Sequence, residues 1–147
     1  MQSIEFTGGP DIIRENLLVA IKEYKITLYT LNKVTGIDIN WLSDYIDKKK
    51  ELADLPIEKY GLLFETTIFL SKGIKMISED ERIKSVINVL VQTFGLKYET
   101  ISHYAGLKIH DIENFMKDTT MIDYEKKYKL ATASMILHYL FKPNYPN

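Results

Sequence analysis

The sequence contains no cysteine, which excludes disulfide bonds, thiolate metal sites and a cysteine nucleophile. It also has no apolar run approaching the roughly 20 residues that a transmembrane helix requires. The N-terminus shows no basic segment followed by an apolar stretch, so nothing there resembles a secretion signal. From these absences we expect neither a secreted framework nor a membrane protein, and we predict a cytoplasmic location.

Motifs that carry catalysis are missing as well. We find no glycine-rich phosphate loop, no nucleophile elbow and no paired-carboxylate motif. His103 and His110 are seven positions apart, but no third ligand accompanies them, so a metal site is not expected. The sequence therefore predicts a protein that is not an enzyme and that needs no metal or cofactor.

An excess of either charge is absent too. The chain carries 19 basic and 20 acidic residues, for a formal net charge of −1. Residues 1–73 hold nine basic and eleven acidic residues, and residues 74–147 hold ten and nine. Proteins that bind nucleic acids usually carry a basic surface, so the overall charge gives no support for that class.

Helical periodicity dominates what is present, and no segment alternates as a strand would. We expect an all-α fold of about eight helices. The first starts near Pro10 or Asp11, and Asp38, Ser78 and Asp123 are suitable N-caps for later helices. A helix after Pro56 should end at Gly73, and Gly61 within it should allow another helix to approach closely.

Two stretches with a central glycine repeat at an offset of 70 positions. They are TLNKVTGIDINWLSDYID (residues 30–47, around Gly36) and TISHYAGLKIHDIENFMK (residues 100–117, around Gly106). The offset also superimposes apolar residues, which predicts a repeat of buried positions. The matched pairs include Leu17 with Ile87, Leu31 with Ile101, Val34 with Tyr104, Ile39 with Ile109, Leu42 with Ile112 and Tyr45 with Phe115.

The repeat predicts two tandem units of four helices, residues 10–73 and residues 78–142, which could also pack as one globule. In each unit, a helix ending at a left-handed glycine and a second helix starting almost at once would form a helix-turn-helix. The last helix, residues 123–141, is apolar on more than one side, so we expect it to contribute to a homodimer. The expected contributors are Tyr128, Leu130, Met135, Leu137 and Phe141.

Both stretches resemble the helix-turn-helix domain of phage repressors of the Cro/Xre-like type. The pattern runs from Leu31 and Asn32 through Gly36 to Leu42 and Ser43 in the first copy. In the second copy it runs through Ile101, Ser102, Gly106, Leu107, Ile112 and Glu113. The resemblance covers residues 11–71 well and residues 78–141 less well. It implies that the second helix of each pair enters the DNA major groove.

The resemblance also implies which residues would meet DNA. Base-reading positions transfer to Ile39, Asn40, Trp41 and Asp44 in the first copy and to Ile109, His110, Asp111 and Asn114 in the second. Lysines beside these helices would contact phosphates. The predicted DNA-binding residues are Asn40, Trp41, Lys48, Lys49, Lys97, Lys108, His110, Asn114 and Lys117.

The two copies differ in how well they suit DNA. An aspartate at position 44 would repel phosphate, whereas the second copy places His110 and Asn114 among lysines. We therefore expect the second copy to bind if only one does. The leading hypothesis is a repressor-like, sequence-specific transcriptional regulator that binds double-stranded DNA. The alternative is a protein-interaction module, similar to an inhibitor or antirepressor, that docks a partner through Trp41, Ile39 and an acidic face.

Overall fold

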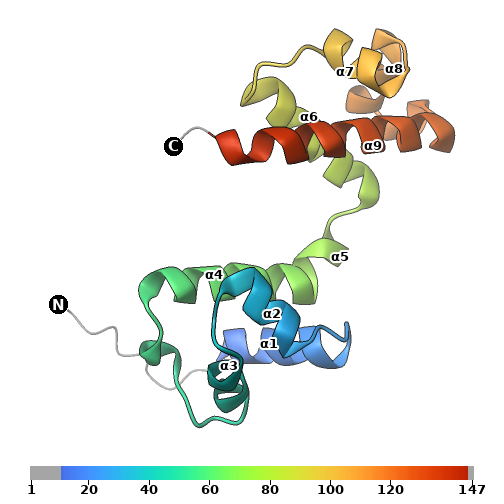
Figure 1. Ribbon diagram of the computed structural model, residues 1–147. Helices are drawn as coiled ribbons and strands as arrows, with labels where there is room; N and C mark the ends of the chain where they lie inside the picture. The colour runs from blue at the N-terminus through green and yellow to red at the C-terminus, as the bar shows by residue number, and fades with distance from the viewer. Residues whose placement is uncertain (1–10, 146–147) are drawn as a thin grey trace. The chain divides into compact units, whose positions relative to one another are not determined.

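The computed structural model describes residues 11–145, and every regular element among them is a helix (Figure 1). The all-α prediction is confirmed. Pro10, near which we expected the first helix to start, lies outside the described residues. So does Pro146, which the sequence predicts, together with Pro143, to stop the last helix. None of the helices in residues 11–145 is long and apolar enough to cross a membrane. The chain divides into two compact units between Met76 and Ile77, called unit 1 and unit 2 below.

Unit 1 is built from four α-helices, three short helical segments and one apolar core. Its helices are α1 (Ile12–Lys22), α2 (Leu28–Thr35), α3 (Ile39–Ile46) and α4 (Ile57–Ile68), and its short segments are η1 (Leu52–Asp54), η2 (Phe69–Gly73) and α5 (Ile74–Met76). Helix α1 packs against α3 and α4, and α4 also contacts α2 (Figure 1). The core contains Ile13, Leu17, Leu31, Ile37, Leu42, Tyr45 and Leu63.

Unit 2 repeats this order of helices around its own core. Its helices are α6 (Glu79–Gln92), α7 (Tyr98–Ala105), α8 (Ile109–Lys117) and α9 (Tyr124–Phe141), with the 3₁₀ turns η3 (Thr119–Met121) and η4 (Lys142–Asn144). Helix α9 packs against α6 and α7. The core contains Ile87, Leu90, Ile101, Ile112, Phe115, Ile122, Leu130 and Leu137.

Short polar side chains start the helices where the sequence predicted. The side chain of Asp38 accepts from the N–H of Trp41 at 3.1 Å, and that of Asp123 accepts from the N–H of Lys126 at 3.0 Å. Ser78 accepts from the third residue of α6 at 3.3 Å. Each bond satisfies a donor that the first turn of a helix leaves free.

The predicted end of the fourth helix is wrong. The helical run passes Gly73 through the π-helical turn η2 and ends at Met76. At position 73 a Cβ atom would lie 2.7 Å from Cδ1 of Phe69, so the glycine makes room for that ring. The expectation for Gly61 is also wrong, because nothing lies within 4 Å of the place where its Cβ would be.

The repeat of buried positions is confirmed for most of the pairs and wrong for two. The buried members are Leu17 with Ile87, Leu31 with Ile101, Leu42 with Ile112 and Tyr45 with Phe115, all at 0% exposure. Val34 and Tyr104, however, are mostly exposed, and Ile39 and Ile109 are also on the surface. These residues lie on the sides of their helices that no other helix of the unit covers.

Helix α9 uses one face for the core of its own unit. Leu130 and Leu137 are buried there, and Phe141 packs against the same cluster and against Phe94. These three residues were expected at a dimer interface, and the structure corrects this expectation. Tyr128 and Met135, by contrast, remain exposed.

Candidate functional site

In unit 1, α2 and α3 form a helix-turn-helix around Gly36. The glycine has the left-handed φ of 69°, and its N–H donates to the carbonyl of Asn32 at 2.7 Å. The Asn32 side chain donates to the carbonyl of Ile37 at 2.8 Å, and Ile37 is buried. From α4, Lys59 donates to the carbonyl of Thr35 at 2.8 Å. The turn is thus fixed both internally and to the neighbouring helix.

In unit 2, α7 and α8 form the equivalent pair around Gly106. Its φ is 68°, and the N–H of the following Leu107 donates to the carbonyl of Ser102 at 2.9 Å. Leu107 packs against the core. The apolar residue after each glycine thus anchors the start of the second helix, as the sequence predicted.

The first residues of these helices differ between the units in a way that changes the local charge. Thr27 and Asp38 cap α2 and α3 with side-chain oxygens. The positions 70 residues later are Lys97 and Lys108, which supply no side-chain hydrogen bond to the ends of α7 and α8. A cation is unfavourable at the positive end of a helix dipole. Unit 2 therefore places a lysine at the start of each of the two helices, although Glu99 and Asp111 lie in their first turns.

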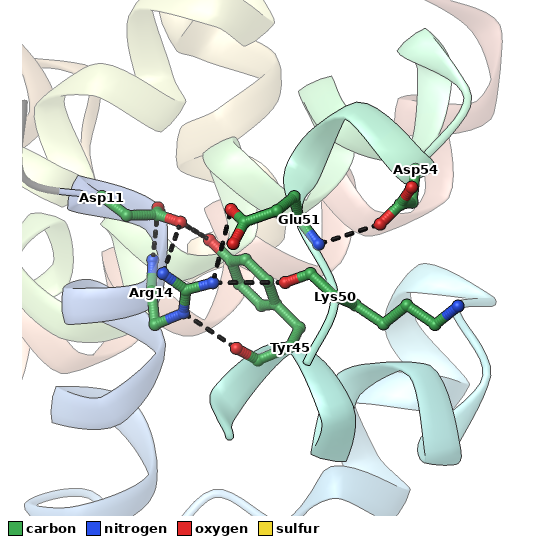
Figure 2. Close-up of polar contacts among 6 residues, drawn as sticks. All are labelled: Asp11, Arg14, Tyr45, Lys50, Glu51 and Asp54. Carbon is green, nitrogen blue, oxygen red and sulfur yellow. Dashed lines mark hydrogen bonds and ion pairs between the residues drawn. The ribbon is translucent and has the colours of Figure 1, made fainter. Parts of the chain in front are cut away.

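A polar network fixes the C-terminal end of α3 to α1 (Figure 2). Nε of Arg14 donates to the carbonyl of Tyr45 at 2.8 Å, and Nη2 donates to the carbonyl of Lys50 at 3.3 Å. The guanidinium also lies 4.4 Å from the centre of the Tyr45 ring and 3.2 Å from Asp11. Arg14 therefore connects α1 with both ends of the segment 45–50.

The Tyr45 hydroxyl completes the network by donating to the Asp11 carboxylate at 2.6 Å. Burial, and then this hydrogen bond, raise the pKa of the Tyr45 phenol far above its ordinary value. The phenol therefore remains a neutral donor. Unit 2 has Phe115 at the equivalent of Tyr45 and Lys84 at the equivalent of Arg14, so it has neither the hydroxyl nor the guanidinium of this network.

The loop after α3 carries the lysines at positions 48–50. Lys48 has a left-handed φ of 61° and donates its N–H to the carbonyl of Tyr45 at 3.1 Å, while the N–H of Lys49 donates to Asp44 at 2.8 Å. These bonds close the end of α3. All three lysines are exposed, on a loop that Arg14 anchors at Lys50.

Asp111 in α8 is buried and paired. Its carboxylate accepts from Nζ of Lys126 at 2.8 Å and from the N–H of Lys108 at 3.1 Å. The hydrogen bond from Lys126 lowers the pKa of Asp111 against the opposing effect of burial, and the same bond raises the pKa of Lys126. The resemblance gave Asp111 a base-reading position, but its burial prevents this.

Most of the predicted DNA-binding side chains lie on the surface. Asn40, Lys48 and Lys49 are exposed on α3 and the loop that follows it. In unit 2, Asn114 is half-buried, and the exposed residues are Lys97, Lys108, His110 and Lys117. Lys108 and His110 line the same open hollow between the start of α8 and the start of α9. Unit 2 thus brings part of the predicted set together.

The helical pattern of the sequence predicts that Tyr29, Trp41 and Tyr98 face outward, but two of these aromatic residues do not. Trp41 is half-buried and stacks on Tyr45, with ring centres 5.1 Å apart and an interplanar angle of 18°. Tyr98 packs against the core of unit 2. Trp41 and Asp111 are equivalent positions, and both are turned towards the protein. Tyr29 is exposed as expected.

Sequence reasoning missed the role of Arg14. The only feature of the sequence that pointed to Arg14 was its position three residues after Asp11, in the first turn of the helix. This spacing predicts a local ion pair but not the bonds to carbonyls 31 and 36 positions further along the chain. Only the packing of α1 against α3 brings those groups together.

A family model described as a helix-turn-helix domain matches residues 9–147, nearly the whole chain. No curated protein and no solved structure matches the chain.

Proposed function

The chain belongs to this helix-turn-helix domain family, and from that premise we propose that it is a sequence-specific, repressor-like DNA-binding regulator of transcription, of bacterial or phage type. It acts by occupying DNA and not by catalysis. Support comes from the two helix pairs, α2 with α3 and α7 with α8, each joined by a left-handed glycine and each exposing the outer face of its second helix. We further propose that the two units are diverged Cro/Xre-like copies.

Unit 2 is the better candidate for the main DNA contact, and the observation that supports this most is the pair of lysines at its helix starts. Lys97 and Lys108 stand where unit 1 has capping oxygens. Helix N-termini bind phosphate through their free N–H groups and the positive end of the dipole, and a nearby lysine adds to that attraction. The Asp111 carboxylate reduces this attraction little, because Lys126 neutralises its charge. The exposed Glu99 in the first turn of α7 reduces the attraction at Lys97.

Within this proposal, phosphate contacts and base contacts fall to different residues. Lys97, Lys108 and Lys117 would contact phosphates, while His110 and Asn114 would reach base edges. In unit 1, Lys48 and Lys49 would contact phosphates and Asn40 an adenine edge. The carboxylates of Asp38 and Asp44 on α3 would weaken that contact. Trp41 would contribute only its exposed edge.

A gel-shift assay with the DNA upstream of the protein's own gene, at two salt concentrations, tests the proposal. Replacing Lys117 with alanine should weaken binding to all sequences alike and lower the salt slope by about one. His110→Ala should instead cost roughly 1–3 kcal/mol on the preferred site and much less on random DNA. Equal effects of both variants on both DNAs would contradict the assignment of roles.

The lysines at the helix starts allow a sharper test. Lys97→Thr and Lys108→Ser should each stabilise unit 2 by roughly 1 kcal/mol, because they restore an N-cap, and should weaken DNA binding. Lys72→Ser removes the same charge from η2, which belongs to neither helix pair, and is the control. If the variants gain stability but bind DNA as tightly as the parent, these lysines do not contribute to DNA binding.

The second candidate, a protein-interaction module, is favoured by the apolar side chains at the start of both second helices. Ile39 and Ile109 are 37% and 40% exposed, and the net charge is close to zero. If Ile39→Ala and Trp41→Ala leave the fold intact but abolish capture of a protein partner, and no DNA binding is seen at low salt, this function replaces the regulator.

We also propose that the protein binds DNA as a homodimer. Two-fold helix-turn-helix proteins present matched helices to half-sites about 34 Å apart, or a multiple of that distance.

A further inference from the structure

Helix α9 is apolar on two opposite faces. One face, with Leu130 and Leu137, is buried in the core of unit 2. On the other face, Tyr128, Met135 and Tyr139 are 72%, 63% and 77% exposed. At 100° per residue, Met135 and Tyr139 fall within about 20° of Tyr128 around the helix. Together with Thr132 they form a continuous exposed row, called the α9 stripe below.

The stripe borders further apolar surface. Met135 also lines a groove of about 390 Å³ between α6 and α9, together with Ile83, Val86 and Ala131. Ile136, beside the stripe, is 61% exposed. A surface of this kind, continuous over three turns of a helix, is unusual for a monomer in water and is typical of an interface.

Unit 1 differs from the α9 stripe at the equivalent positions. The positions 70 residues before Tyr128 and Met135 are Glu58 and Glu65, both exposed on α4. The positions equivalent to Thr132 and Tyr139 are Leu62 and Phe69, which are apolar and 37% and 49% exposed. Two carboxylates therefore interrupt the equivalent row in unit 1, whereas the α9 stripe carries no charged side chain between Tyr128 and Tyr139.

The stripe is complementary to itself when two copies of α9 run antiparallel. With a two-fold axis between Ala133 and Ser134, Tyr128 lies level with Tyr139 of the second copy, and Thr132 lies level with Met135 of the second copy. The same register brings Glu125, which also lies 3.5 Å from Lys129 of its own helix, level with Lys142 of the second copy. A parallel pair would instead place Glu125 beside Glu125 and Lys142 beside Lys142.

We propose that a second copy of this chain covers the α9 stripe, in an antiparallel and isologous helix pair centred between Ala133 and Ser134. In such an interface each contact occurs twice, and the assembly closes as a dimer. The aromatic rings of Tyr128 and Tyr139 are its main anchors. The interface supplies the dimer of the proposed function, but it forms without DNA.

The mass of the full-length chain in the absence of DNA tests this interface. Sedimentation equilibrium should give about 34 kDa, twice the 17.1 kDa of one chain. Tyr139→Glu and Met135→Glu, which each place a carboxylate in the stripe, should weaken self-association by roughly tenfold or more. Tyr104→Glu changes an equally exposed tyrosine of α7 in the same unit and should leave the dimer intact. Circular dichroism establishes that each variant is folded.

Because the chain has no cysteine, single cysteines can report the direction of the helices. Tyr128→Cys and Tyr139→Cys proteins, mixed and oxidised, should form the 128–139 disulfide. Each variant alone should cross-link poorly, since in the antiparallel register the two copies of one residue are offset by about 16 Å along the helix, while a disulfide needs Cα atoms within about 7 Å.

Two outcomes would overturn the inference. One is a monomer mass up to high micromolar concentration, which would mean that unit 1 of the same chain or a different partner covers the stripe. The other is efficient cross-linking of each single variant with itself, which indicates parallel helices. A dimer that binds no DNA would support the interface and contradict the proposed function, so the interface and the function are tested separately.

Discussion

Lys25 and Gly95 occupy equivalent places after the first helix of each unit, and both have a left-handed backbone. Their φ values are 60° and 71°. The hydrogen bonds that follow are equivalent too, from the N–H of Ile26 to the carbonyl of Ala20 at 3.1 Å and from Leu96 to Leu90 at 3.0 Å. A residue with a Cβ loses roughly 1–2 kcal/mol in this conformation, and glycine does not. Unit 1 therefore carries a strain that unit 2 avoids.

The first prediction follows from this difference. Lys25→Gly should stabilise unit 1 by roughly 0.5–1 kcal/mol, and Gly95→Ala should destabilise unit 2 by about 1 kcal/mol, because nothing lies within 4 Å of its added Cβ and only the φ angle matters. Urea unfolding measures both. Lys25→Ala is the control, since it removes the bond from Nζ to the carbonyl of Lys22 and keeps the strain. If Lys25→Gly destabilises as much as Lys25→Ala, the strain is not the deciding factor.

The second prediction concerns pH and Asp111. Its pKa is lowered from the ordinary 3.8, chiefly by the hydrogen bond from Lys126. An acid with a lowered pKa in the folded state stabilises the fold above its ordinary pKa, and this contribution is lost as the pH falls through the folded-state pKa. The stability difference between the parent and Asp111→Asn should therefore shrink between pH 6 and pH 3.

Urea unfolding of both proteins at several pH values in that range measures this difference. Glu113→Gln, an exposed carboxylate on the same helix, is the matched control. A difference between the parent and Asp111→Asn that stays constant down to pH 3 would show that the contact acts through packing and not through charge.

At the scale of one element, α4 and η2 contain two glycines with opposite surroundings. Gly61 is exposed, with free space where a Cβ would lie, while the Cβ of a residue at 73 would meet the Phe69 ring at 2.7 Å. Glycine inside a helix is less stable than alanine by roughly 0.5–1 kcal/mol, because it orders more backbone on folding. The same substitution should therefore have opposite effects at the two sites.

The third prediction is that Gly61→Ala stabilises unit 1 by roughly 0.5–1 kcal/mol and that Gly73→Ala destabilises it. Gly61→Ala keeps every contact of the folded state and only reduces the conformational entropy of the unfolded chain. Gly73→Ala forces the Phe69 ring to move. Thermal unfolding of both variants is the measurement. Stabilisation by Gly73→Ala would mean that the Phe69 ring moves aside at little cost.

At the scale of the whole molecule, each unit has its own closed apolar core. Leu42 belongs to one core and Ile112 to the other, and both are fully buried. Trp41, the single tryptophan of the chain, lies in unit 1 beside Leu42. Its fluorescence therefore reports on unit 1 alone, while circular dichroism at helical wavelengths reports on both.

The fourth prediction uses these two signals. Leu42→Ala should destabilise unit 1 by roughly 2–5 kcal/mol and shift the fluorescence transition, because it leaves a cavity in that core. Ile112→Ala should shift part of the circular dichroism transition and leave the fluorescence transition in place. One coincident transition that both variants shift alike would show that the units unfold together.

The sequence by itself determined the helices and their caps. Helical period, a capping oxygen at Asp38, Ser78 and Asp123, and the left-handed turns at Gly36 and Gly106 depend on neighbours within a few residues, so local chemistry is enough to predict them. The offset of 70 likewise located the most deeply buried pairs. The continuation past Gly73 was missed because the cause is the ring of Phe69, which the helical pattern does not reveal.

Only the tertiary structure decided which apolar and charged side chains reach the surface. Leu130 and Met135 are both large apolar residues of α9, and the sequence alone does not separate them. In the structure Leu130 is in the core and Met135 is in the α9 stripe. Asp111 and Trp41 were expected to contact DNA, but in the structure both side chains turn towards the protein. The physical reason is that burial depends on which other helices cover a face. The bonds from Arg14 to the far end of α3 depend on the same packing.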